Sequence, residues 1–450
     1  MRINGKNTAG VTAAIAAAAA LGLIGAGPGY AEKSGGRPAS CPTSGEMPAI
    51  GNSPRFTDNN VALFAGGDYT ADGAAAEAEG LLVVKGRATF AKSSGGVFNV
   101  GRVGAGSGIL PTSGNVMLAV GGDLSIAKGT TVDVGSGLTT GPKYGGSVQI
   151  GGSLNAAGSL QTNGGASPSQ MGPARAIEPY AGFDRTLQDE SASLGALKQT
   201  GTAIRSGATV TFKSTAASVG NIQVFAISAA DINGASSFVF EAIPENSSVL
   251  VNVTGTPGVS ISPMSVGFNG ERVDIYSSPK YGQAASRILY NFREAASLTL
   301  GGGGNFIGSI LAPKASADLT ASTNGRLYVG GNVRMHGTGN ESHNYPWSGT
   351  PAFACKPELP APPTPSASVP QPSRPGTPEQ PGLPDRPTPS AESPGATPPK
   401  SAGPNTPGDG KSLAETGGSH ATVLAVSATA AVALAGGAGV FAAARRRRRT

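Results

Sequence analysis

One short pattern recurs along the chain and limits how it can fold. Each copy holds an apolar run, one or two glycines, a polar residue and then alternating apolar positions. The five copies are LFAGGDYTA from Leu63, LVVKGRATF from Leu82, LAVGGDLSI from Leu118, VQIGGSLNA from Val148 and LYVGGNVRM from Leu327. Glycine inside a strand pattern marks a bend or a close approach of backbones, as at the corner of a coil. Stacking such units would bury one continuous core, so the pattern predicts a mainly β chain built as a β-solenoid.

The spacing of the copies leaves a second architecture open. Their glycines fall irregularly, at positions 66, 86, 121, 151 and 330, and this irregularity keeps a β-sandwich or jelly roll as the alternative. Composition favours strands in either case, because 69 of the 450 residues are glycine and only 13% are charged. Such a chain turns often and packs backbone against backbone.

One segment interrupts the strand patterns with a helical one. Its apolar residues Phe183, Leu187, Leu194 and Leu197 keep to one helical face, which predicts an amphipathic helix packed on the strands. Gly201 is the expected end of this helix.

The first residues have the layout of a secretory signal. Two basic residues, Arg2 and Lys6, precede an apolar run, and the small residues GPGYA follow it. This order predicts a signal peptide at residues 1–31, cleaved between Ala31 and Glu32, and therefore an exported chain.

The last residues hold an apolar span and a basic stop. Residues 421–444 carry no charge, and at about 1.5 Å per residue a helix of that length would cross the roughly 30 Å hydrocarbon core of a bilayer. Arg445–Arg449 follow directly, and such a cluster stays on the cytoplasmic side. The chain before the span is therefore expected outside the cell.

A short motif precedes this span. It consists of Leu413, Ala414, Glu415, Thr416 and Gly417. Motif, span and basic stop together resemble the cell-wall sorting signal of Gram-positive surface proteins, and LAETG is similar to the Leu-Ala-x-Thr-Gly variant of the sortase motif. Ala414 stands where the commoner motif has proline, which leaves the sortase class open.

That resemblance implies a covalent anchor on peptidoglycan. A sortase cysteine would attack the carbonyl of Thr416, and an amine of a peptidoglycan precursor would resolve the thioester. Residues 413–450 would form the sorting signal and hold the precursor in the membrane until cleavage. The alternative is a plain tail-anchored membrane protein.

The formal charge of the whole chain, +6, comes from these two ends. Removing residues 1–31 and 417–450 takes away seven of the 33 Lys and Arg residues and none of the 27 Asp and Glu residues, so 26 basic residues face 27 acidic ones. The net charge of about −1 gives no electrostatic case for a nucleic-acid partner.

Proline and cysteine positions divide the exported part of the chain. Residues 356–412 hold 18 of the 35 prolines, which predicts an extended linker that reaches up to about 180 Å through the wall. Residues 32–54 are a Gly-, Ser- and Pro-rich lead-in, and residues 55–355 are the expected β-rich domain. Cys41 and Cys355 are the only cysteines and flank that domain. In an exported chain we predict a disulfide between them, with two free thiols as the alternative.

Three stretches carry a resemblance to a known family. They are NNVALFAGGDYTADGAAAEAEGLLVVKGRATFA at 59–91, RILYNFREAASLTL at 287–300 and NFIGSILAPKASADLTASTNGRLYVGGNVRM at 305–335. Together they resemble the choice-of-anchor A domain, a family of bacterial surface domains joined to various C-terminal anchors. LYNF and GSILAP also resemble segments of ice-binding-type right-handed β-helices. The resemblance implies a right-handed β-helix with an associated α-helix, an adhesive role and no catalytic residues.

Few residues suggest chemistry of their own. The three histidines are His336, His343 and His420, and no His, Cys and carboxylate spacing suits zinc. His336 and His343 could join Glu341 within MHGTGNESHNYPW, but we interpret this stretch as a polar loop leaving the domain. The sequence therefore predicts no metal site and no cofactor.

The polar residues after the glycines should occupy equivalent places on successive coils. They are Asp68, Arg87, Asp123, Ser153 and Asn332. A stacked acidic row could bind calcium or form a glycosidase carboxylate pair. Because Arg87 stands between the two aspartates in that row, a solvated corner is the favoured interpretation.

These features predict a non-enzymatic surface protein that displays a β-rich domain for an extracellular ligand. The alternative is a β-helix enzyme that acts on polysaccharide at the cell surface. Ice binding would need a flat, regular, Thr-rich face, and the threonines of LTASTNG, from Leu319 to Gly325, are too sparse for one.

Overall fold

The computed structural model describes residues 47, 49–139, 143–215 and 221–349. Two compact units divide the chain, Met1–Pro357 and Glu358–Thr450, and the second lies wholly outside the described residues. The expected signal peptide, disulfide, linker and sorting signal also fall outside them. Within the described ranges, no helix is both long and apolar enough to cross a membrane.

Three parallel sheets form the body of the described domain. Sheet 1 has nine strands, in the order β12 (Ser147–Ile150), β9 (Val116–Val120), β5 (Leu81–Val84), β2 (Val61–Ala65), β29 (Leu327–Val329), β26 (Ser309–Ala312), β23 (Ile288–Phe292), β19 (Ser248–Thr254) and β17 (Ile222–Ser228). Sheet 2 has eight strands, in the order β13 (Leu154–Ala156), β10 (Leu124–Ile126), β6 (Ala88–Lys92), β3 (Tyr69–Gly73), β30 (Val333–Met335), β27 (Ser316–Leu319), β24 (Ser297–Leu300) and β20 (Val259–Ile261). Sheet 3 has seven strands, in the order β14 (Ser159–Gln161), β11 (Thr130–Val134), β7 (Gly96–Gly101), β4 (Glu77–Glu79), β31 (Glu341–His343), β28 (Ser322–Asn324) and β25 (Asn305–Ile307).

Smaller elements complete this domain. The remaining strands are β15 (Gly201–Ser206), β16 (Thr209–Ser214), β18 (Ser237–Glu241), β21 (Ser265–Phe268) and β22 (Glu271–Arg272), which form a five-stranded sheet, and β1 (Phe56–Thr57) and β8 (Ile109–Leu110), which pair with each other. The helices are α1 (Pro173–Ala176), α2 (Phe183–Gly195), α3 (Ala229–Ile232) and α4 (Tyr281–Arg287).

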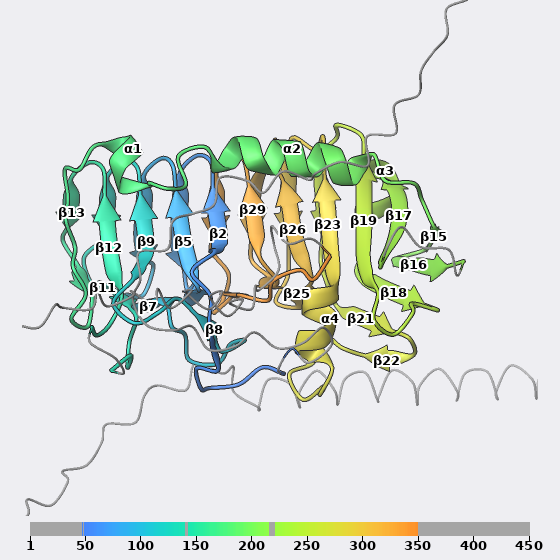
Figure 1. Ribbon diagram of the computed structural model, residues 1–450, viewed down its shortest axis with the longest axis horizontal. Helices are drawn as coiled ribbons and strands as arrows, with labels where there is room; N and C mark the ends of the chain where they lie inside the picture. Colours follow the sequence, from blue (N-terminus) through green and yellow to red (C-terminus); the bar gives the residue numbers. More distant parts are fainter. Residues whose placement is uncertain (1–46, 48, 140–142, 216–220, 350–450) are drawn as a thin grey trace, which may run out of the picture. The chain divides into compact units, whose positions relative to one another are not determined.

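Most turns of the chain visit sheets 1, 2 and 3 in order, and each turn is one coil of a β-helix. The turns that begin with β17 and β19 pass through the five-stranded sheet in place of sheet 3. The prediction of a β-solenoid is therefore confirmed, and the β-sandwich alternative is wrong. The order of the coils does not follow the sequence, however. The chain begins in the middle with β2, builds coils out to β12, and is carried by α1 and α2 to the far end, where β17 begins (Figure 1).

From that far end the coils return to the middle. The last coil (β29, β30, β31) pairs in parallel with the first coil (β2, β3, β4), and we call this junction the seam. The seam joins strands separated by more than 260 residues, as in the register pair Leu63 and Leu327. The irregular glycine spacing follows from this path, because α2, the five-stranded sheet and several coils with other corners lie between Gly151 and Gly330.

The recurring glycines sit where sheet 1 turns into sheet 2. A Cβ on Gly66 would lie 2.3 Å from the Gly330 carbonyl oxygen, and one on Gly151 would lie 2.0 Å from the Gly121 oxygen. Backbones of neighbouring coils therefore touch at this corner, which leaves no room for a side chain. This confirms the close approach that the sequence pattern predicts.

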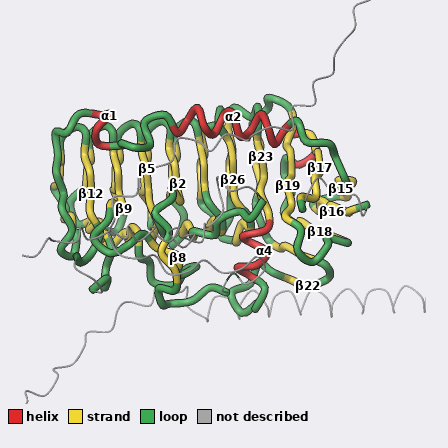
Figure 2. Tube along the Cα trace, in the orientation of Figure 1, coloured by secondary structure: helices red, strands yellow, loops and turns green. Residues whose placement is uncertain are grey.

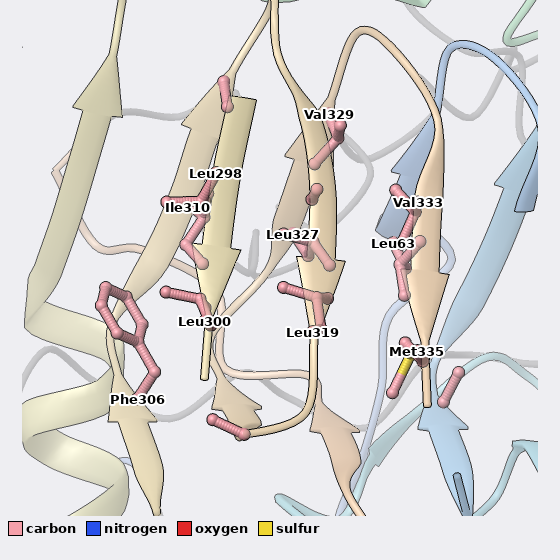
Figure 3. Close-up of a cluster of buried hydrophobic side chains, with 14 of the residues drawn as sticks. Leu63, Leu298, Leu300, Phe306, Ile310, Leu319, Leu327, Val329, Val333 and Met335 are labelled. Atoms are coloured by element: carbon pink, nitrogen blue, oxygen red, sulfur yellow. The ribbon is translucent and has the colours of Figure 1, made fainter. Parts of the chain in front are cut away.

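The core lies inside the coil. Inward side chains from all three sheets meet there, including Leu63, Leu298, Phe306, Leu327 and Met335 (Figure 3). These side chains form one continuous apolar core.

The outer side of sheet 1 is buried as well. Helix α2 runs across its strands (Figure 2), and the Phe183 ring makes edge contacts with Phe64 at 5.2 Å and Tyr328 at 5.7 Å. Strands covered on both faces read as continuous apolar runs, as in VALFA of β2 and LLVV of β5. The predicted associated helix is confirmed, but it ends at Gly195, since Gly201 already begins β15.

Candidate functional site

Sheet 2 presents a polar face to solvent. Its central outward positions are in register from one end to the other, and all of them are half-buried or exposed. The row, which we call the sheet 2 row, consists of Ser260, Thr299, Asp318, Arg334, Thr70, Thr89, Ser125 and Asn155. With neighbouring strands about 4.8 Å apart, the row extends over about 34 Å.

The middle of the row is charged, and the residues on either side of it carry hydroxyls, except for the amide of Asn155 at one end. Arg334 Nη2 lies 2.9 Å from Asp72 Oδ2, and His336 Nε2 lies 2.7 Å from Asp318 Oδ1. The bond and the charge of Asp72 raise the pKa of Arg334, so this guanidinium stays charged. The row therefore offers donors, acceptors and both charge signs from one end of the sheet to the other.

The other two sheets are covered over part of their outer faces. Sheet 1 lies under α1 and α2. In sheet 3, the outward side chains of Glu77, Glu79, Asn324 and His343 are all buried. Segments next to β8 and after β31 cover them, since the backbone N–H groups of Ser107, Gly108 and Asn344 donate to the Glu79 carboxylate at 2.8 to 2.9 Å.

The predicted corner residues do occupy equivalent places. Asn332 N donates to Ser316 Oγ, Asp68 N to Asn332 Oδ1, and Arg87 N to Asp68 Oδ1, at 2.8 to 3.1 Å. We call this chain of bonds the corner ladder. It is interrupted after Arg87 and resumes where Ser153 N donates to Asp123 Oδ1 at 2.7 Å.

The hydrogen bonds of the corner ladder account for the polar residues at this corner, so no catalytic role is needed to explain them. The backbone bond from Arg87 lowers the pKa of Asp68 against the effect of burial, so this carboxyl is ionised and serves as an acceptor rather than an acid. The favoured interpretation of a solvated corner fits these contacts, with the addition that the side chains link one coil to the next.

One sequence interpretation is wrong at the end of the domain. Glu341 and His343 do not belong to a loop leaving it, because they form β31, which pairs with β4 at the seam. Their side chains meet Glu77, and the ligand atoms of the three all lie within 4.8 Å of one another. His336 does not join them, since it pairs with Asp318 beside the sheet 2 row.

Burial and charge set the protonation of this cluster. Burial and the Glu341 carboxylate raise the pKa of Glu77 to about 7. Burial opposes protonation of His343, but its contact with Glu341 and the charges of Glu79 and Glu77 outweigh burial and raise its pKa. Sequence reasoning missed Glu77 and Glu79, and their alternation in AAAEAEG among small residues was the available signal.

A buried ion pair also holds the seam. Asp58, just after β1, pairs with Arg326, just before β29, and Arg326 Nε also donates to Asn344 Oδ1 at 3.0 Å. Neither residue stood out in the sequence. The remaining predicted site residues lie outside the described residues: Ala31, Glu32, Cys41, Cys355, Leu413, Ala414, Glu415, Thr416 and Gly417.

The chain matches a known family over most of the β-helix. A family model with the description "Putative Ice-binding-like adhesive domain" matches residues 59–344. None of the curated proteins matches the chain.

Solved structures of ice-binding proteins are similar to the chain at low identity. One from an Antarctic biological consortium is 14% identical with a TM-score of 0.27, over 66% of this chain and 92% of that one. One from the Antarctic ascomycete Antarctomyces psychrotrophicus is 13% identical with a TM-score of 0.30, over 64% and 95%. One from an Antarctic bacterium of the Flavobacteriaceae is 13% identical with a TM-score of 0.26, over 67% and 82%.

Proposed function

The chain belongs to the ice-binding-like adhesive domain family, and from that membership we propose that it is a non-enzymatic surface adhesin. Its β-helix would hold an extended extracellular polymer along the outward face of sheet 2. The observation that carries this proposal is the in-register sheet 2 row, which places eight polar side chains in one line.

The shape of the row suits a long, repetitive ligand. A flat line of about 34 Å with one side chain every 4.8 Å or so can make many similar weak contacts at once. Hydroxyls from Thr70, Thr89 and Ser125 can both donate and accept. A polysaccharide, which offers hydroxyl groups at short repeats along its length, is the polymer class with matching chemistry.

The charges in the row argue against ice as the ligand. Asp318 and Arg334 are register neighbours at its middle, and each binds a further charged or ionisable side chain. A face that orders water as ice needs a regular, uncharged array. The same charges suit a polymer that also carries carboxylates or amines.

We also propose that the exported protein is attached to peptidoglycan through Thr416. This rests on the sequence order of LAETG, an uncharged span and five arginines. Anchoring complements adhesion, because a linker of up to about 180 Å would carry the β-helix beyond the wall.

A binding panel with two matched variants tests the adhesin. The mature chain, Glu32 to Thr416, is applied to immobilised polysaccharides and to ice. We expect retention on at least one polysaccharide, and Thr89→Tyr should weaken it by about tenfold or more because the ring obstructs the row. Thr131→Tyr on sheet 3, also half-buried, should leave it unchanged.

The same samples distinguish adhesion from the alternatives. Accumulation of reducing ends or unsaturated products would assign the domain to the polysaccharide-acting enzymes. Inhibition of ice recrystallisation, lost in Thr89→Tyr, would make ice the ligand. Equal loss of retention in both tyrosine variants would remove sheet 2 as the binding face.

A further inference from the structure

The seam brings together a set of side chains suited to a metal ion. Glu77 comes from β4 in the first coil, and Glu341 and His343 come from β31 in the last. Glu341 and Glu77 are register partners, so both carboxylates leave the sheet on the same side. The group forms only when the two ends of the β-helix meet.

The Nδ1 atom of His343 has the hydrogen-bond partner that a metal-binding histidine typically has. Its Nδ1 lies 2.7 Å from Asn324 Oδ1. The Asn324 Nδ2 donates to the Phe306 carbonyl at 3.2 Å, so its Oδ1 is left to accept a proton from Nδ1. A histidine that binds a metal characteristically donates its other ring N–H in this way.

The other ring nitrogen faces the carboxylates without a hydrogen-bond partner. His343 is only 1% exposed, and its Nε2 makes no hydrogen bond, although it lies 3.3 Å from Glu341 Oε2. Nε2 therefore faces the Glu341 carboxylate at a distance where either a proton or a metal ion can balance the negative charge. A metal cation at this position would offset the charges of the buried Glu77 and the half-buried Glu341.

Neighbouring groups hold the Glu77 carboxylate, and two tyrosines are buried nearby. Glu77 Oε2 accepts from Asn99 Nδ2 and from Gly104 N, each at 3.1 Å. The hydroxyls of Tyr281 and Tyr345 are also buried without a hydrogen-bond partner, and their rings pack at 6.2 Å from each other.

We propose that Glu77, Glu341 and His343 bind one divalent transition-metal ion that fastens the first coil to the last. Two carboxylates and one imidazole are a ligand set for Zn²⁺, Mn²⁺ or Fe²⁺, whereas Ca²⁺ prefers oxygen ligands alone. Tetrahedral ligands at about 2.1 Å from Zn²⁺ lie about 3.4 Å apart. The three side chains, now within 4.8 Å, would close inward on binding. This role is independent of the ligand on sheet 2.

Zinc binding by the mature chain, Glu32 to Thr416, tests the proposal. After chelation and dialysis, the protein is titrated with Zn²⁺ by calorimetry, and Co²⁺ is added separately to read ligand-field absorption. We expect one ion per chain and a rise of several degrees in the unfolding temperature at saturating Zn²⁺. His343→Gln should weaken Zn²⁺ affinity by about 100-fold or more.

His336→Gln is the matched control, because it removes the other histidine of the described domain and leaves the cluster intact. It should bind Zn²⁺ like the unmodified chain. The unmodified chain decides the matter even if His343→Gln fails to fold. Absence of binding with 1 mM Zn²⁺, or equal loss of affinity in the two variants, would overturn the site and leave the cluster as a proton-sharing group.

Discussion

Replacing Gly66 with alanine tests the stacked corner at the seam. The three atoms nearest to a Cβ there all belong to the Gly330 backbone: the oxygen at 2.3 Å, the carbonyl carbon at 2.8 Å and the Cα at 3.0 Å. Neither coil can yield by rotating a side chain. The first and last coils must therefore separate locally for the methyl group to fit.

The expected cost follows from that geometry. When neighbouring side chains can move to accommodate an extra group, overpacking lowers the free energy of unfolding by about 1–3 kcal/mol. A clash between two backbones belongs at the upper end of this range, about 3 kcal/mol. In a domain of this size, a loss of that order lowers the unfolding temperature by about 5 °C.

Gly303→Ala provides the control for this substitution. Nothing lies within 4 Å of a Cβ on Gly303, and its backbone is not in the left-handed region. At Gly303 the added methyl group only reduces the conformational freedom of the unfolded chain. We therefore expect the free energy of unfolding to rise by about 0.4–1 kcal/mol. Urea unfolding of both variants measures the difference, and equal stabilities would refute the stacked corner.

Three further outcomes are expected. Leu187→Ala under α2, where the side chain is fully buried, should cost about 2–5 kcal/mol in urea unfolding, and a cost below about 1 kcal/mol would contradict the packing of α2 on sheet 1. Burial alone would raise the pKa of Asp184, but its bond to Lys85 at 2.9 Å, the Lys85 charge and two backbone N–H groups together lower it. The stabilisation is therefore present above the ordinary pKa of 3.8 and is lost as pH falls through the folded-state pKa. Asp184→Asn should therefore cost up to about 1 kcal/mol at pH 7 and less as the pH is lowered, and a cost that does not change with pH would exclude the ion pair. Thr416→Ala should leave the protein in the membrane fraction or the medium, so muramidase release of a wall-linked variant would refute sorting at this residue.

The local architecture could be predicted from the sequence because it depends on neighbouring residues. Glycines such as Gly66 and Gly121 mark corners wherever two coils touch, and the helical spacing of Phe183 and Leu187 marks α2. The predicted end of that helix, Gly201, lies beyond its observed end at Gly195. Leu197 caused the difference, because it follows the helix but still packs against the cluster beneath α2.

The order of the coils could not be predicted in the same way. Coils that turn through Phe292 or Ala312 lack a glycine pair at the corner, so they do not match the repeated pattern. The first coil pairs with the last because the chain comes back to the middle of the domain after more than 260 residues. No short sequence pattern indicates this pairing. Glu77 and His343 consequently appeared unrelated, although the seam places them in one cluster.

Covalent labelling of carboxylates in the presence of a bound polysaccharide tests the role of sheet 2 most directly. Asp318 lies in the sheet 2 row with 45% of its side chain exposed, whereas Asp133 is half-buried on sheet 3. If the polymer lies along sheet 2, Asp318 is protected on binding and Asp133 is labelled as before. Protection of Asp133 with unchanged labelling of Asp318 would contradict the account.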